Sequence, residues 1–426
     1  MSARKILVRG ARQLLTLRGI AAPRRIDSMS DLGLVPDGAV LIQDERIVTV
    51  GPGRRIENLA EARGAEVIDA DGCVVMPGFV DPHTMLVSGP SRVEEFERHV
   101  MGASLEQSGL LREGLQAQVR NVRNLPARRL ELQAKNTLLR CLRHGTTTIE
   151  AKTGYGLDDT GEMKSVRVLE DLQACPISVL PTWFGARALP PEFDGNADGY
   201  LRFLMEEMMP RVARRKSIGH IDADPAACGF SLHQTVQFLR TARLAGFTPR
   251  LHAALHQADA NVEVAVAMRA ESVSHCNYIT DDQIGHLCDS STVAVLLPGL
   301  AYHLRLNRLA PARRLIDGGA AMALASGYDP LYSPTCNMQM VISLACNQLH
   351  MSPAEAIQAA TFNAACAAGV AREAGSLEAG KFADLLILSV PDYREIPYHF
   401  GMNLVSTVIR RGAIVHRETA PEWRVA

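Results

Sequence analysis

The sequence predicts an α/β protein, a (β/α)8 TIM-type barrel that carries a small β-rich domain formed by both chain termini. From Val74 to about Ala368, short β-branched or apolar runs alternate with amphipathic helical stretches, which is the pattern of a parallel sheet. Eight such runs can be counted. Residues 1–73 and 374–426 instead contain strand-like runs separated by turn-forming residues. These three observations place the barrel at residues 74–373.

The eight predicted barrel strands are short and rich in β-branched or apolar residues. In chain order they span residues 74–81, 146–151, 177–183, 218–222, 249–254, 271–275, 292–298 and 321–326. Barrel enzymes carry their chemistry on the loops that follow the carboxyl ends of the strands. The residues that follow each run are therefore the first candidates for a functional site.

The helices between the strands have recognisable faces and ends. Leu130, Ala134 and Leu138 share one face at helical spacing. Gly145 is placed to end that helix, because glycine readily adopts the left-handed conformation found there. Ser231 precedes the helical run LHQTVQFLRTARLAG and is predicted to be its N-cap.

The composition excludes several classes of protein. Lys and Arg number 45 against 46 Asp and Glu, so the chain lacks the basic excess that nucleic acid or an anionic membrane requires. No apolar run is long enough to span a bilayer, and the N-terminus lacks the pattern of a signal peptide. The nine cysteines include no Cys-x-x-Cys pair, which favours reduced thiols and a cytoplasmic location.

An ordered series of segments resembles the imidazolonepropionase family of the amidohydrolase superfamily. The series covers about residues 38–417 and includes PGFVDPHT at 77–84, EAKTGYGL at 150–157, SPT at 333–335, GSLEAGKFADLLIL at 375–388 and IPYHFGMN at 396–403. The resemblance implies a (β/α)8 barrel with a composite β-sandwich, and a homodimer. It also implies hydrolytic ring opening of 4-imidazolone-5-propanoate to N-formimidoyl-glutamate, a step in histidine degradation.

The resemblance further implies a metal site at the barrel mouth. Family members hold zinc or iron with a His-x-His pair after the first strand, a His after the fifth and an Asp after the eighth. The metal activates water, and a neighbouring side chain handles the proton. In this sequence His83 and His252 match two of the metal ligands, and His275 matches the histidine that handles the proton.

Four further residues are candidates for substrate binding. Arg92 and Tyr155 match substrate contacts of the family, Arg187 stands where the family has a histidine, and Asp329 stands where it usually has asparagine. A guanidinium is a good partner for a carboxylate, so the two arginines favour a small anionic ligand. Arg92 can instead pair with a glutamate that follows it. Arg187 can instead fill the space of a lost metal, and Asp329 before a proline can form an ordinary turn.

Several positions depart from the family pattern. Met85 replaces the second histidine of the pair, and a thioether is a poor zinc ligand beside imidazole. Gly327 replaces the aspartate after the eighth strand, and Ala254 and Leu255 replace two carboxylates of a His-Ala-Asp-Glu motif. Arg187 adds a cation near the metal position, which repels a divalent ion. Zinc or iron is implied by the family, but most of its ligands are absent.

Three hypotheses about function follow. The first is a divergent or inactive homologue that keeps a pocket for a small anionic ligand, lined by Arg92, Tyr155, Arg187, His252, His275 and Asp329. The second is an active imidazolonepropionase or cyclic-amide hydrolase with a rearranged site. The third is a non-catalytic partner subunit of an active paralogue. The missing ligands favour the first.

Overall fold

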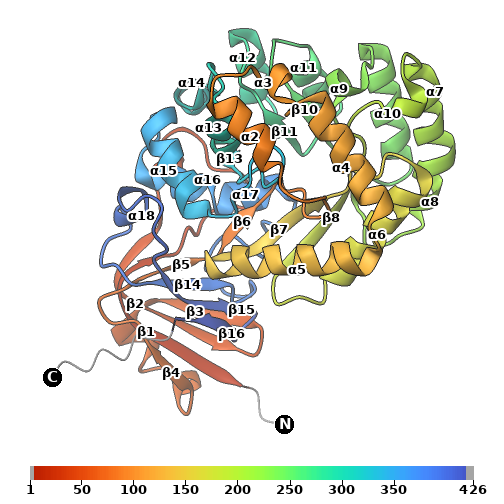
Figure 1. The fold of residues 1–426 in the computed structure, drawn as a ribbon. Coiled ribbons are helices and arrows are strands. Elements are labelled where there is room, and N and C mark those ends of the chain that lie inside the picture. The colour runs from red at the N-terminus through yellow and green to blue at the C-terminus, as the bar shows by residue number, and fades with distance from the viewer. Residues whose placement is uncertain (1–3, 419–426) are drawn as a thin grey trace.

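A computed structural model gives the fold of residues 4–418 and confirms the predicted class (Figure 1). Eight parallel strands form a barrel with helices around it, and hydrogen bonds connect them in the order β13-β12-β11-β10-β9-β8-β7-β6. The barrel strands are β6 Phe79–Asp81, β7 Thr146–Lys152, β8 Ser178–Ala186, β9 His220–Ala223, β10 Thr248–Ala253, β11 Ser272–His275, β12 Val293–Leu296 and β13 Met322–Leu324. Where β13 meets β6, Ser326 donates its backbone N–H to Asp81 Oδ1 (3.0 Å).

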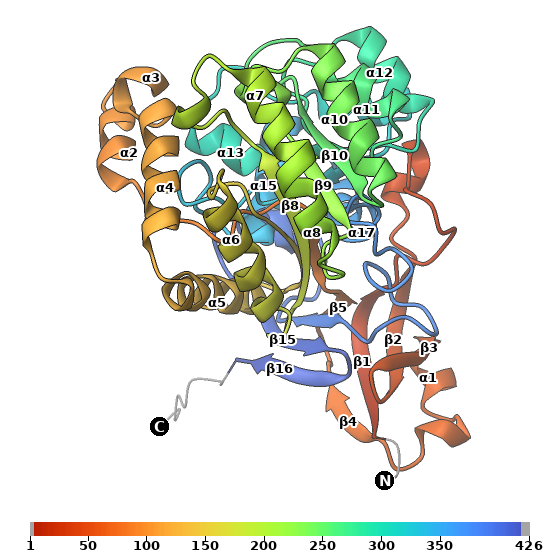
Figure 2. The same cartoon turned by 90° about the vertical axis from the view of Figure 1, so that its right-hand side faces the viewer.

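Most of the helices connect successive barrel strands and cover the outside of the barrel, and the last four follow β13 (Figure 2). They are α2 Val93–Val100, α3 Leu105–Ser108, α4 Arg112–Asn124, α5 Ala127–Arg143, α6 Asp159–Leu172, α7 Ala197–Arg202, α8 Met209–Ala213, α9 Pro225–Cys228, α10 Leu232–Leu244, α11 Asn261–Ala267, α12 Asp281–Cys288, α13 Pro298–His303, α14 Ala312–Gly318, α15 Met338–Leu349, α16 Pro353–Ala359, α17 Phe362–Ala367 and α18 Glu395–Tyr398, with a π-helical turn at Phe203–Met208. Among the described residues no helix combines the length and apolar character needed to cross a membrane.

The predicted helix faces and ends are confirmed. Helix α5 buries Leu130, Ala134 and Leu138. Gly145 follows it with a φ of +94°, and a Cβ there would lie 2.7 Å from a methyl carbon of Leu386. Ser231 caps α10, because its Oγ accepts the N–H of the residue three positions later.

Replacing Ser231 with alanine is expected to lower the free energy of unfolding by about 1 kcal/mol, since one N–H of the first turn loses its acceptor. Urea denaturation measures this loss. Gln237 is exposed on the same helix, so Gln237→Ala is a control that should change stability by less than about 0.5 kcal/mol. Equal effects of the two substitutions would contradict the capping role.

Both ends of the chain build a second sheet, which we call the terminal sheet. Its hydrogen-bonded order is β16-β15-β14-β5-β1-β2-β3, with β4 also paired to β1. The strands are β1 Lys5–Leu15, β2 Leu34–Gln43, β3 Arg46–Pro52, β4 Glu66–Asp69, β5 Val74–Pro77, β14 Leu385–Leu388, β15 Val405–Arg410 and β16 Ala413–Arg417. Short helices outside this sheet lie at Ile26–Ser30, Gly53–Ile56, Ala60–Ala62 and Pro191–Phe193. The turn between β2 and β3 and the beginning of β3 hydrogen-bond the segment before β14. The terminal sheet has an apolar core of its own.

One predicted strand is wrong in its extent. The run at 74–81 forms two strands, of which β5 pairs with β14 and β1 in the terminal sheet, and β6 belongs to the barrel. Gly78 lies between them, and a Cβ there would lie 2.1 Å from Thr147 Oγ1. All residues of both strands are buried, so an apolar run alone does not reveal where the chain changes sheets.

Candidate functional site

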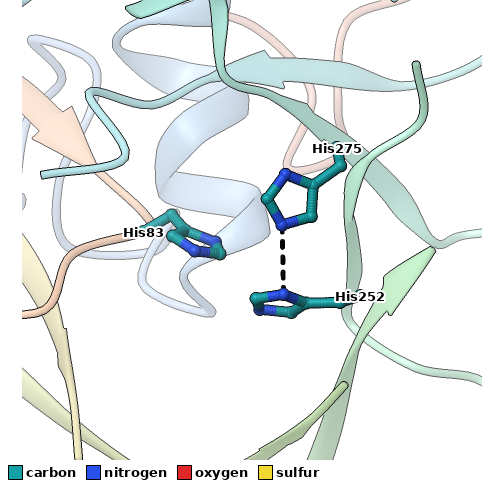
Figure 3. A group of neighbouring side chains, drawn as sticks. All are labelled: His83, His252 and His275. Atoms are coloured by element: carbon teal, nitrogen blue, oxygen red, sulfur yellow. Dashed lines mark hydrogen bonds between the residues drawn. The ribbon is translucent and has the colours of Figure 1, made fainter. Parts of the chain in front are cut away.

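Three histidines converge at the carboxyl ends of the barrel strands (Figure 3). His83 follows β6, His252 lies in β10 and His275 ends β11. His275 Nε2 and His252 Nδ1 are 3.0 Å apart, in hydrogen-bonding contact. One ring nitrogen from each histidine lies within 4.8 Å of those of the other two. The structure therefore brings together the two predicted metal ligands and the predicted catalytic histidine, all of them buried.

Polar side chains behind the cluster orient two of the imidazoles. His83 Nδ1 lies 3.0 Å from Ser274 Oγ. His252 Nε2 lies 3.2 Å from Asp222 Oδ2. The second ring nitrogen of a metal-binding histidine is commonly held by a carboxylate or a hydroxyl in this way. In His275, Nδ1 is buried and has no hydrogen-bond partner within residues 4–418.

Two of the three histidines, His83 and His275, favour the neutral form. Burial lowers the pKa of His83 well below its usual value, and the cation of Lys152 lowers it further. Burial also lowers the pKa of His275, with a contribution from His252. Neutral imidazoles keep a lone pair, which is the form that binds a metal ion.

The residues present fit a metal ion held by three imidazoles. Three neutral nitrogen donors are a known set for catalytic zinc, and imidazole suits iron as well. The hydrogen bonds of His252 with Asp222 and of His83 with Ser274 add the orientation that such ligands need. The three histidines therefore support a metal in general, although not the ligand set that the family resemblance implies.

The position where the family resemblance implies an aspartate lies against Leu297. Gly327 follows β13 with a φ of +63°, and a Cβ at this position would lie 2.6 Å from Leu297 Cδ2. Met85 is 2% exposed and belongs to the main apolar core. Leu255 packs against another apolar cluster. Met85 and Leu255 are thus part of apolar packing, and Leu297 lies against Gly327.

Tyr155, Arg187 and Asp329 form a second buried cluster after β7, β8 and β13. Arg187 Nη2 donates to Tyr155 Oη (2.8 Å) and lies 3.2 Å from Asp329 Oδ2. The Tyr155 hydroxyl donates to the same carboxylate at 2.7 Å. Arg187 is thus a cation near the histidines, as expected, and Asp329 offsets part of its charge. Arg187 Nε stays buried without a partner among the described atoms.

Arg92 adopts the structural alternative. It precedes α2 and forms an ion pair with Glu95, three residues later. Its side chain is 28% exposed. Of the four residues predicted to bind substrate, the structure thus joins three in one cluster and pairs the fourth with its own helix.

The structure contains a buried network of charged residues that was not predicted from the sequence. Lys152 Nζ lies 2.8 Å from Glu150 Oε2 and 2.6 Å from Asp222 Oδ2. Arg250 also pairs with Glu150 inside the barrel and reaches Glu271 at 2.9 Å. The spacing of Glu150 and Lys152 could have indicated this network, because residues two apart in a strand face the same side of the sheet.

Comparison with known proteins reveals close relatives. Residues 250–415 match the Amidohydrolase family model. Imidazolonepropionase of Geobacillus kaustophilus is 40% identical over 97% of this chain and 98% of that protein. The enzyme of Parabacteroides distasonis is 38% identical over 97% of this chain and 99% of its own. This chain belongs to the imidazolonepropionase family. The family resemblance inferred from the sequence segments is confirmed.

Solved structures place this imidazolonepropionase-family chain among amidohydrolase folds. A triazine hydrolase variant superposes with a TM-score of 0.72 at 17% identity and covers 97% of this chain and 95% of that one. A zinc-bound adenosine deaminase of Xanthomonas campestris gives a TM-score of 0.65 at 17% identity. The superposition covers 96% of this chain and 92% of the deaminase chain. At such identities the likeness concerns the fold, which is the barrel with its additional sheet.

Proposed function

We propose that this family member no longer catalyses metal-dependent ring opening and instead binds a small carboxylate-bearing molecule at the barrel mouth. The observation that carries the proposal is the packing of Leu297 over Gly327. The family resemblance implies an aspartate at position 327 that binds metal and accepts the proton of the attacking water. Here a side chain at that position meets Leu297 instead.

The remaining carboxylates support the same conclusion. Ring opening by water needs a group that accepts a proton. Burial alone would raise the pKa of Asp222, but Lys152 and His252 hold it well below its usual range. Such a carboxylate is a weak base. Asp329 is occupied by Arg187 and Tyr155. A metal held by the three histidines would polarise a carbonyl or acidify a water molecule. His275, which matches the family's proton-handling histidine, would then be one of the metal ligands, and position 327 carries no aspartate to accept the proton instead.

Arg187 is the residue best placed to hold a ligand carboxylate. Its Nη2 is used by Tyr155 and Asp329, whereas Nε is a buried donor without a partner in the described part of the chain. Carboxylates favour such guanidinium donors. The anionic preference therefore rests on this one guanidinium, because Glu95 already pairs with Arg92.

Arg187→Met is expected to weaken ligand binding about tenfold or more, the usual effect of losing one charge-assisted hydrogen-bonding group. Calorimetric titration with 3-(imidazol-4-yl)propanoate measures the dissociation constant. Arg211, which pairs with Asp159 on the surface, provides the control substitution Arg211→Met. Unchanged affinity in Arg187→Met, or no saturable binding by the unmodified protein, would contradict the proposed ligand site.

A rearranged hydrolase is the second candidate. The hydrogen bonds of His252 with Asp222 and of His83 with Ser274 favour it. Asp224 favours it as well, because its Oδ2 lies 3.7 Å from His252 Nδ1 and its side chain is 23% exposed. In this alternative Asp224 accepts the proton. Zinc-dependent turnover that disappears in Asp224→Asn while zinc binding persists would establish it over the first proposal.

A further inference from the structure

A separate cavity of about 240 Å³ lies between the barrel and the terminal sheet. Thr148 and Ser178 reach it from near the beginnings of β7 and β8, and Arg410 reaches it from the end of β15. Both views place β15 and β16 beneath the barrel (Figures 1 and 2). The histidines lie at the opposite, carboxyl ends of the barrel strands. The cavity is thus distinct from the candidate site at the mouth.

Arg410 brings an unpaired cation to this cavity. Its Nη2 donates to Ser178 Oγ (3.2 Å). Its Nε is buried and has no hydrogen-bond partner within residues 4–418. Among residues 4–418, no carboxylate oxygen lies within 4.0 Å of the guanidinium nitrogens of Arg410. A buried guanidinium donor without an acceptor is costly, so an anion that entered the cavity would gain a partner already in place.

Two arginines and two carboxylates line the cavity, Arg410 and Arg411 against Glu373 and Asp384. Burial and the adjacent Arg411 lower the pKa of Arg410 more than Asp384 and Glu45 raise it. Arg411 stacks on the ring of Phe382 at 4.1 Å and also has an unpartnered, buried Nε among the described atoms. Asp384 accepts the backbone N–H of Arg411 (2.7 Å). The carboxylate of Asp384 therefore neutralises part of the charge but does not pair with Arg410.

The remaining lining is partly apolar. Phe382, Val370 and Leu180 contribute carbon surface beside the polar groups. The cavity is smaller than the roughly 300–1,000 Å³ of sites for drug-sized ligands. Its size and mixed lining suit a short organic acid better than an inorganic anion.

We propose that this cavity binds a small organic carboxylate, with the carboxylate on Arg410 and the carbon chain against Phe382 and Val370. The proposal does not depend on the function of the barrel mouth. The binding site is formed jointly by the barrel and the terminal sheet, so the ligand would link the two parts of the molecule.

The test is calorimetric titration of the full chain with glutarate, with its uncharged diamide and with inorganic phosphate. Glutarate is expected to bind saturably, and Arg410→Gln to weaken it about tenfold or more. Arg417→Gln removes an exposed arginine from the adjoining strand β16 and should leave the affinity within about twofold. Arg187→Met should also leave it unchanged, which separates this site from the barrel mouth.

Three results would overturn the proposal. They are no saturable glutarate binding by the unmodified chain, equal affinity in Arg410→Gln, and binding of the diamide or of phosphate as tight as that of glutarate. Val370→Phe provides a second variant that keeps every charge and fills the cavity from its other wall. This substitution should abolish glutarate binding. It therefore tests the proposed site even if Arg410→Gln fails to fold.

Discussion

Replacing Lys152 with methionine is expected to lower the free energy of unfolding by about 3–5 kcal/mol, the usual cost of removing one partner from a buried ion pair. The Lys152 side chain is 1% exposed and lies between two fully buried carboxylates. Without it, Glu150 still has Arg250, whereas Asp222 keeps His252 and the backbone N–H of Ala223 but no permanent cation among the described residues. The lost stabilisation therefore concerns mainly Asp222, the carboxylate that hydrogen-bonds His252.

The pH dependence tests the electrostatic cause of this loss. In the unmodified protein, Lys152 holds the pKa of Asp222 below its unfolded value, so this pair contributes stability above about pH 4 and loses it as the pH falls further. In Lys152→Met, burial raises the pKa of Asp222, so stability is expected to fall as the pH rises. The deficit measured by urea denaturation should be larger at pH 8 than at pH 5.

Lys216 provides a matched control because it is exposed, and Lys216→Met should change stability by less than about 0.5 kcal/mol. If Lys152→Met has as small an effect, or a deficit that does not depend on pH, the buried network does not stabilise the barrel in the way described.

Gly327→Asp is expected to lower the free energy of unfolding by about 2–4 kcal/mol, from left-handed backbone strain and from overpacking against Leu297. A Cβ at position 327 would lie 2.6 Å from Leu297 Cδ2. The variant restores the aspartate that the family resemblance implies. It is nevertheless expected to show no ring-opening activity, because the new side chain has to displace Leu297 to reach the metal position.

Gly229→Asp isolates the backbone contribution. Gly229 has a φ of +67°, close to the +63° of Gly327, and a Cβ there would have nothing within 4 Å. Its substitution should cost only about 1–2 kcal/mol. If both variants lose equally little stability, and Gly327→Asp gains metal-dependent turnover, the space for the aspartate is open and the proposed loss of function is wrong.

The barrel could be predicted because its strands are short apolar runs between helices with clear faces. Gly145 and Ser231 marked helix ends by local backbone chemistry, which sequence reveals directly. The division of residues 74–81 between two sheets could not be predicted in this way. It depends on β14, which lies about 310 residues further along the chain, and every residue of β5 and β6 is buried.

The histidine cluster was predictable for a similar reason, since strand ends and family motifs both indicate His83, His252 and His275. The pairing of Arg187 with Asp329 was not, because the two residues are 142 positions apart. Only the barrel brings them together. The sequence showed that Arg187 was a cation near the site, but not that a carboxylate from the other side of the barrel mouth offsets it.

The most direct test of the proposed loss of hydrolysis is the absorbance of 4-imidazolone-5-propanoate over time, with the purified protein in the presence of Zn²⁺ or Fe²⁺. We predict that the absorbance falls no faster than in buffer with the same metal. A turnover of about 1 s⁻¹ or faster lies within the ordinary range of enzymes. Such turnover would contradict the proposed loss of hydrolysis if it saturates with substrate and is removed by chelation.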